Sequence, residues 1–232
     1  MKILAIDTSG PVCGAAVLDG EKVLSEYTAM NRNTHSTNLM PMAEAALTSA
    51  GCCLGDMEAI AAVTGPGSFT GVRIGVATAK GLAHGAGIPC IPVDALEALA
   101  ASAGAFDGVI CPIQDARAGQ VYGAAFTDGE RKTEDLAIRI EEFLTEIRKH
   151  GERFLFLGDG VAVHREKIRE TMGESACFAA PAMNYLRPAA AGWLAMTRGE
   201  PVSYLELEAR YLRPPNAQKN KKLMEAMGLA ET

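Results

Sequence analysis

The sequence has no excess of positive charge and few aromatic residues. Its 232 residues include 22 Lys and Arg against 28 Asp and Glu, which gives a formal net charge of −6, and aromatic residues make up only 6%. A protein that binds nucleic acid by itself neutralises the phosphates with a basic surface. The charge balance therefore argues against nucleic-acid binding by this chain alone.

Ligand patterns for metals and disulfides are also missing. The six cysteines, at positions 13, 52, 53, 90, 111 and 177, form no C-x-x-C pair. The four histidines, at positions 35, 84, 150 and 164, are never three or four residues apart, the spacing that places two ligands on one helix face. We therefore expect reduced thiols and no metal, and spacing alone indicates no catalytic constellation.

Long apolar runs are absent too. No stretch approaches the roughly 20 apolar residues of a membrane span, and the first apolar run ends at Asp7, too early for the core of a secretory signal. Hydrophobic residues nevertheless make up 48% of the chain, which is typical of globular proteins. We expect a cytoplasmic protein that makes no membrane contact.

Hydrophobic periodicity predicts an α/β protein. Turn signals separate the first apolar segments, and helical and strand-like segments then alternate in the order βββαβαβα. The expected strands are 2–6, 12–18, 22–28, 59–63 and 90–93, and the expected helices are 36–50, 70–84 and 95–102. This order suits a mixed sheet covered by helices.

The pattern restarts after Gly104. The second half predicts strands at 109–113, 120–126 and 154–157 and helices at 138–149 and 164–171. We therefore expect two lobes, residues 1–104 and 105–214, followed by a tail at 215–232.

A Gly/Pro-rich loop, residues 64–69, joins an expected strand to an expected helix. Such a loop can direct backbone N–H groups at an anion. It matches neither a P-loop nor a G-x-G-x-x-G pattern. A tight turn in which Ser68 or Thr70 caps the helix is the simpler interpretation.

Small residues recur every four positions in that helix, at Gly67, Gly71, Gly75 and Ala79. A ridge of minimal side chains lets another helix approach closely. Two interpretations stay open: packing within the lobe, or an interface with another chain. The neighbouring helix favours the interface, because its Met40 and Met42 cannot both point inward.

Two acidic turns follow expected strands. In the first, Asp7, Thr8 and Ser9 could hold magnesium and a phosphate, or simply bond to turn amides. The segment from Gln114 to Arg117, which contains Asp115, allows the same two interpretations.

Taken together, several segments resemble the TsaB (YeaZ) family. The resemblance is carried by Ile6-Asp7-Thr8-Ser9, by His35 opening a helix with Leu39 and Pro41, by the run from Thr64 to Gly75, by Lys80-Gly81-Leu82, by Asp115-Ala116-Arg117 with Gly119-Gln120-Val121-Tyr122, and by Tyr211-Leu212-Arg213-Pro214. It covers residues 1–214, most strongly 1–125, and the run 65–75 is long and specific.

The resemblance implies an actin-like ATPase (ASKHA) fold of two ribonuclease-H-like lobes with mixed sheets flanked by helices. It implies a role in making N6-threonylcarbamoyladenosine at position 37 of tRNA. The expected partners are a metal-bearing paralogous transferase subunit (TsaD-like) and a small ATPase subunit (TsaE-like). Alone, the chain is expected to form a homodimer, and to meet tRNA only through the complex.

The sequence lacks the metal ligands that the resemblance assigns to the catalytic paralogue. The paralogue's His-x-x-x-His ligands fall on Ala95 and Leu99, which cannot coordinate an ion. The double glycine of an actin-like nucleotide site is missing after Asp7 and after Asp115. We expect a non-catalytic scaffold subunit, with Asp7, Thr8, Ser9 and Asp115 as candidates for weak ATP or ADP binding.

Two enzyme classes remain as alternatives, a metal-dependent peptidase and a small-molecule kinase of the same fold. For the scaffold, helices 36–50 and 70–84 are expected to form a four-helix seam with a partner, and Gly75→Leu to block pairing in a folded monomer. The expected interface residues are Leu39, Met42, Ala43, Ala46, Gly71, Gly75 and Ala79.

Overall fold

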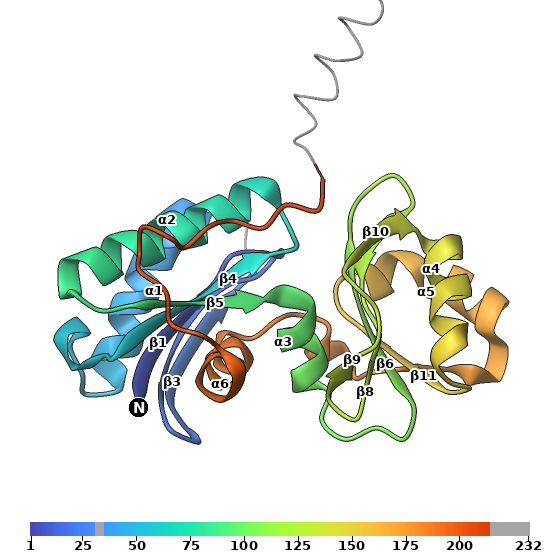
Figure 1. The fold of residues 1–232 in the computed structure, drawn as a ribbon, viewed down its shortest axis with the longest axis horizontal. Helices are drawn as coiled ribbons and strands as arrows, with labels where there is room; N and C mark the ends of the chain where they lie inside the picture. The colour runs from blue at the N-terminus through green and yellow to red at the C-terminus, as the bar shows by residue number, and fades with distance from the viewer. Residues whose placement is uncertain (31–34, 214–232) are drawn as a thin grey trace, which may run out of the picture.

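The computed structural model describes residues 1–30 and 35–213. A five-stranded sheet forms the first lobe, with strand order β3-β2-β1-β4-β5 (Figure 1). Its strands are β1 (Lys2–Asp7), β2 (Cys13–Asp19), β3 (Lys22–Ala29), β4 (Ala59–Gly65) and β5 (Cys90–Asp94). The first three form an antiparallel meander, and β1, β4 and β5 run parallel. The predicted βββαβαβα order is confirmed.

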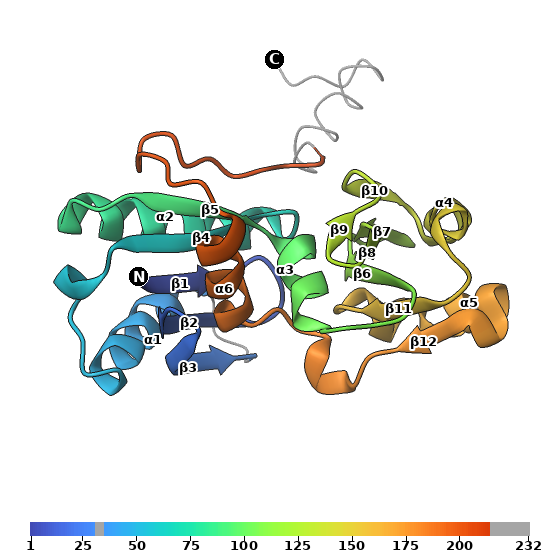
Figure 2. The ribbon, with the colours of Figure 1, turned by 60° about the horizontal axis from the view of Figure 1, so that its bottom comes forward.

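Helices cover both faces of this sheet. The helices α1 (His35–Ser49) and α2 (Phe69–Ala86) lie on one face, and α3 (Ala95–Ser102) and α6 (Pro188–Arg198) lie on the other (Figure 2). A separate apolar cluster fills each side, because β1 and β4 are buried on both faces and alternate residues point to opposite clusters.

Local signals set the ends of the helices. The Ser68 hydroxyl accepts a hydrogen bond from the Gly71 N–H at 3.2 Å and so caps α2, as one of the two sequence interpretations expected. Gly87, in the left-handed region at φ 68°, ends α2. The Asp94 carboxylate accepts from the Glu97 N–H at 2.8 Å and caps α3.

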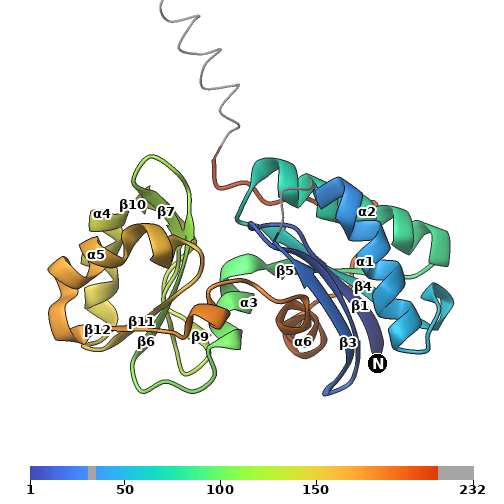
Figure 3. The same cartoon turned by 180° about the vertical axis from the view of Figure 1, so that it is seen from behind.

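A second sheet, with β6 near its centre, forms the other lobe (Figure 3). Its strands are β6 (Val109–Asp115), β7 (Gln120–Gly123), β8 (Phe126–Thr127), β9 (Glu130–Arg131), β10 (Leu136–Arg139), β11 (Phe154–Leu157) and β12 (Ala176–Phe178). The helices are α4 (Ile140–Ile147) and α5 (Gly160–Met172). Short 3-10 turns occur at Leu54–Asp56, Arg148–His150, Gly173–Ser175 and Pro181–Met183.

Several predictions for the second lobe need correction. The expected strand 120–126 breaks into β7 and β8, and the expected helix 138–149 begins only after β10. The sequence pattern did not predict β12 or α6. The strands β7, β8 and β12 have too few residues to show a clear period, which is why the pattern failed for them.

The expected second lobe, residues 105–214, includes α6, but α6 packs on the sheet of the first lobe. It packs on β1 and β2, where a Cβ on Gly192 would lie 2.4 Å from a Leu18 methyl. Residues 199–213 then run along α2 (Figure 1). The expected tail at 215–232 lies outside the described residues. Among those described, no helix is both long and apolar enough to cross a bilayer, and all six cysteines are free.

Candidate functional site: an interlobe cleft and an open helix face

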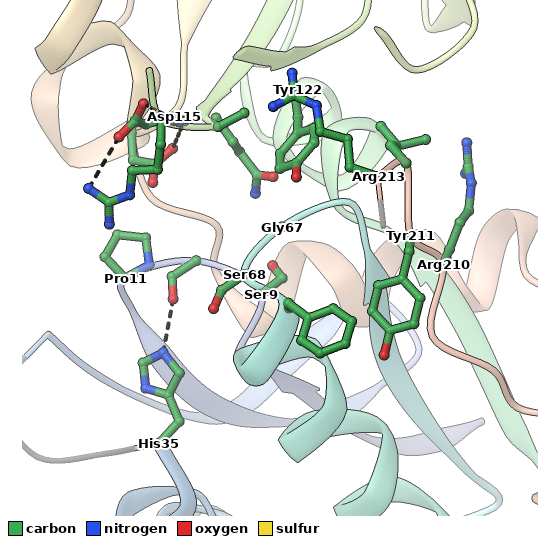
Figure 4. A pocket seen from close by; sticks show the side chains of 17 residues that line it. Ser9, Pro11, His35, Gly67, Ser68, Asp115, Tyr122, Arg210, Tyr211 and Arg213 are labelled. Carbon is green, nitrogen blue, oxygen red and sulfur yellow. Dashed lines mark hydrogen bonds and ion pairs between the residues drawn. The ribbon is translucent and has the colours of Figure 1, made fainter. Parts of the chain in front are cut away.

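A cleft of about 440 Å³ opens between the lobes. One wall is the β1–β2 turn with His35 and the loop before α2, and the other is the β6–β7 turn with Asp159. The third side is the C-terminal segment around Tyr211 (Figure 4). Three chain segments far apart in sequence therefore build one site.

The first acidic turn lies at this cleft, and its side chains have different roles. Asp7 is buried, and its carboxylate accepts from the Ser9 N–H at 2.8 Å. Burial raises the pKa of Asp7 to about 6. The Thr8 hydroxyl points away from the cleft and donates to the Gly71 carbonyl at 2.7 Å. The Ser9 hydroxyl is buried without a hydrogen-bond partner of good geometry.

The second acidic turn is bonded internally as well. Asp115 accepts from the Arg117 N–H at 2.9 Å and pairs with its guanidinium at 3.5 Å. Arg117 and Ala118 adopt φ of 66° and 52°, the left-handed region that favours glycine. In both turns the acidic residue satisfies turn amides, the simpler of the two interpretations.

Sequence reasoning missed Asp159, which follows β11 in the turn Gly158-Asp159-Gly160. Its carboxylate accepts from the Asp115 N–H at 3.1 Å. Burial raises the pKa of Asp159 to about 6. A Gly-Asp-Gly turn between a strand and a helix was the available signal, because strand ends of one sheet gather at one edge.

The C-terminal segment also contributes residues that sequence analysis named only as family marks. The Tyr211 ring stacks on Phe69 with centroids 4.8 Å apart, and its hydroxyl accepts from Arg73 Nε at 2.8 Å. The Arg213 guanidinium lies 5.5 Å from the Tyr122 ring centre, and its Nη2 is buried without a partner. No local pattern could reveal that residues 210–213 return to this cleft.

The positions matching the paralogue's metal ligands lie elsewhere. Ala95 and Leu99 are 0% and 1% exposed and pack in the apolar cluster under α3. Neither offers a ligand atom. Within residues 1–30 and 35–213, no group of three or more His, Cys, Asp or Glu side chains is arranged to hold a metal.

The predicted interface residues are mostly internal. Leu39, Ala43, Ala46, Gly71, Gly75 and Ala79 are buried within the first lobe, and Met42 is half-buried. The glycines make room for the β1–β2 turn: a Cβ would lie 2.0 Å from the Thr8 carbonyl oxygen at Gly71 and 2.6 Å from the Thr8 hydroxyl at Gly75. The ridge therefore serves packing within the lobe, and Gly75→Leu is a poor test of pairing because it disturbs the fold.

A different face of α2 is open. Ala77, Gly81 and Gly85 form a second row of small residues at four-residue spacing, all exposed, and a Cβ at either glycine meets nothing within 4 Å. On the adjacent helix α1, Met40 is 48% exposed. We use the term α1–α2 face for these four exposed residues, Met40 of α1 and Ala77, Gly81 and Gly85 of α2.

The fold and cleft define a two-lobed α/β protein in which each lobe is built on its own sheet and is covered by helices. A family model described as "TsaD: tRNA N6-adenosine threonylcarbamoyltransferase" matches residues 22–200. The chain is 35% identical to the tRNA threonylcarbamoyladenosine biosynthesis protein TsaB of Bacillus subtilis, over 94% of this chain and 96% of that protein. The chain belongs to the TsaB family.

Further comparisons agree. The Escherichia coli TsaB is 40% identical over 56% of this chain and 57% of its own. The solved structure of YeaZ from Pseudomonas aeruginosa matches with a TM-score of 0.74 at 27% identity, covering 91% of this chain and 99% of that one. The match extends over both lobes, so the resemblance noted from the sequence is confirmed.

Proposed function

We propose that this protein is a non-catalytic scaffold subunit that activates a metal-bearing, TsaD-like transferase for threonylcarbamoylation of adenosine 37 in tRNA. The observation that carries the proposal is the pair of buried apolar side chains at Ala95 and Leu99. By the family resemblance, these two side chains fall at the positions of the paralogue's metal ligands, and both are buried in an apolar cluster. A chain without those ligands needs a partner that supplies the metal.

The α1–α2 face is the proposed docking surface. Its small residues permit close helix–helix approach, and Met40 offers an adaptable apolar contact. A stable interface of this kind buries roughly 1,200–2,000 Å². In the absence of the transferase subunit, the same face is proposed to pair two copies of this chain, and a small TsaE-like ATPase completes the assembly.

Transfer RNA is proposed to meet this chain only within the complex, since the chain carries a net charge of −6. Weak binding of ATP or ADP in the cleft, at Asp7, Ser9 and Asp115, is compatible with the role but not needed for it. Thr8 is the fourth candidate, and its hydroxyl already donates to the Gly71 carbonyl.

Reconstitution tests the proposal. The transferase subunit, the small ATPase, threonylcarbamoyl donor and unmodified tRNA are incubated with and without this chain, and modified adenosine is measured by mass spectrometry. We expect product only when this chain and the transferase are both present. Equal product without this chain would refute the scaffold role.

The enzyme alternatives have direct tests. Stoichiometric zinc or iron in the purified protein, together with peptide hydrolysis, would favour the peptidase. Tight Mg-ATP binding with turnover on a small acceptor would favour the kinase. The scaffold proposal expects neither.

A further inference from the structure

Two arginines in the second lobe share one aromatic ring. Arg165 and Arg169 lie four residues apart on α5, and their guanidinium carbons are 4.2 and 5.4 Å from the centre of the Phe178 ring on β12. The ring is held in place because β12 pairs with β11, where Phe178 lies beside the fully buried Phe156 with ring centres 6.0 Å apart. The two cations therefore rest on a fixed support. We term Arg165, Arg169 and Phe178 the α5–β12 patch.

Neither guanidinium has an acidic partner. In the described part of the chain, Arg165 and Arg169 contact the ring but form no ion pair and no hydrogen bond. Of the acidic side chains on α5, Glu170 pairs with Lys167 at 4.0 Å, and Glu166 pairs with neither arginine. Like charges at this helix spacing repel each other. The patch therefore holds two positive charges that nothing in the described chain neutralises.

The chemistry of the patch suits phosphate. A guanidinium that lies over a ring keeps its N–H edge free, and this planar edge donates two parallel hydrogen bonds to a phosphate. Two such edges on one ring can contact neighbouring phosphates of a nucleic-acid strand, because that strand carries one phosphate per nucleotide. A row of anions thus satisfies both arginines at once.

We propose that the α5–β12 patch binds the phosphate backbone of the tRNA when this chain is part of the assembly described above. The inference rests on the proposed function, because that function supplies the RNA. Helix α5 lies at the opposite end of the molecule from α1 and α2 (Figure 1). A transferase subunit on the α1–α2 face and an RNA strand on the patch can therefore be bound at the same time.

The patch adds affinity only inside the assembly. Alone, the chain offers the RNA two arginines and an unfavourable net charge of −6, so its own affinity is low. An RNA already held by the transferase subunit meets the patch at a high effective concentration, and the two contacts then add to the overall affinity. This is consistent with a chain that meets tRNA only through its complex.

The test uses the reconstituted assembly and unmodified tRNA. Initial rates of modification, and tRNA binding to the complex of this chain with the transferase subunit, are measured at salt concentrations from about 50 to 200 mM. The Arg165→Gln/Arg169→Gln variant lacks both cations. We expect its KM for tRNA to be about tenfold higher with kcat unchanged, and the slope of log affinity against log salt to fall by about 1–2.

Two further variants separate a phosphate contact from a general effect of charge. Lys149→Gln/Lys167→Gln is the matched control, because it removes two exposed cations of the same lobe, each of which pairs with a glutamate. It should keep the KM and salt slope of the parent. Arg165→Lys/Arg169→Lys retains the charge but loses the planar edge, and should restore only part of the affinity. Thermal unfolding verifies the fold, and calorimetry with each partner subunit verifies assembly.

The outcomes distinguish this inference from the proposed function. Equal modification without this chain would refute the scaffold role and the RNA contact together. If the chain is required but the glutamine variant keeps the KM and salt slope of the parent, the scaffold role stands and the RNA contact is refuted. If the glutamine variant instead loses affinity for the transferase subunit or the small ATPase, the patch docks protein, which also overturns the proposal.

Discussion

Asp94 and Asp135, carboxylates from opposite lobes, are bound to the same two arginines. Arg131 reaches Asp94 at 3.0 Å and Asp135 at 2.5 Å, and Arg210 reaches them at 2.6 and 2.5 Å. Asp94 also caps α3. This cluster therefore connects the first lobe, the second lobe and the C-terminal segment.

Removing one of the shared cations should loosen the connection between the lobes. Arg210→Met leaves the fully buried Asp135 with one arginine, and because Arg210 is 45% exposed we expect a loss of only about 1–2 kcal/mol in the free energy of unfolding. Urea denaturation measures it. Arg198→Met, which removes a more exposed pair with Glu97, is the control and should cost less; an equal cost for both would contradict this account.

The same cluster should make stability depend on pH. Burial, and then the charge of Asp94, raises the pKa of Asp135 from 3.8 to about 6. Between these values the folded protein binds more protons than the unfolded chain at Asp135, so the contribution of this group to stability is present below about pH 4 and is lost as pH rises through 6. We expect a loss of about 1–3 kcal/mol between pH 4 and 7 from this group.

The Asp135→Asn variant should show a flatter dependence of unfolding free energy on pH between 4 and 7, because it lacks the titrating carboxyl group. This holds whatever the substitution does to the absolute stability. Thermal unfolding at pH 4, 5, 6 and 7 in both proteins measures the difference in slope. Parallel profiles for the two proteins would show that Asp135 titrates normally.

Two rows of small residues on α2 should respond in opposite directions to added bulk. Gly71→Ala places a Cβ 2.0 Å from the Thr8 carbonyl oxygen, so we expect a loss of about 2 kcal/mol or more. Gly81→Ala meets open space and should gain about 0.5–1 kcal/mol from helix propensity. Urea midpoints for the two variants measure this, and loss in both would contradict the assignment of the open face.

A glycine in the β6–β7 turn should reduce backbone strain at position 118. Ala118 has φ 52°, a region that costs an L-residue roughly 1 kcal/mol, so Ala118→Gly should raise the unfolding free energy or leave it unchanged despite the added freedom of the unfolded chain. Ala116→Gly, in the same turn but without positive φ, is the control and should lower it. An equal loss of unfolding free energy in both variants would contradict the expected reduction of strain at Ala118.

Much of the first lobe could be predicted because its elements are long and its period is clear. The meander, α1, α2 and α3 all follow local signals such as the Asp19-Gly20 turn and the Asp94 cap. The return of α6 could not be predicted, since its Ala/Gly-rich side is matched to Leu18 and Ala5 only in three dimensions.

The site was predicted less well for the same reason. Asp7, Ser9 and Asp115 were identified because turns after strands have a local signature. Four-residue spacing revealed a ridge on α2 but not which way it faces: Gly71 and Gly75 contact Thr8, 63 and 67 positions away in the sequence.

The central claim, that the α1–α2 face docks a metal-bearing transferase subunit, is tested most directly by calorimetric titration of that subunit with this chain. Gly81→Arg places a long charged side chain on the open face without disturbing the monomer, and Gly81→Ala is its matched control. We predict that Gly81→Ala binds like the parent, whereas Gly81→Arg and Met40→Lys bind at least about thirtyfold more weakly, a change of about 2 kcal/mol. Unchanged affinity in both folded charged variants would contradict the account.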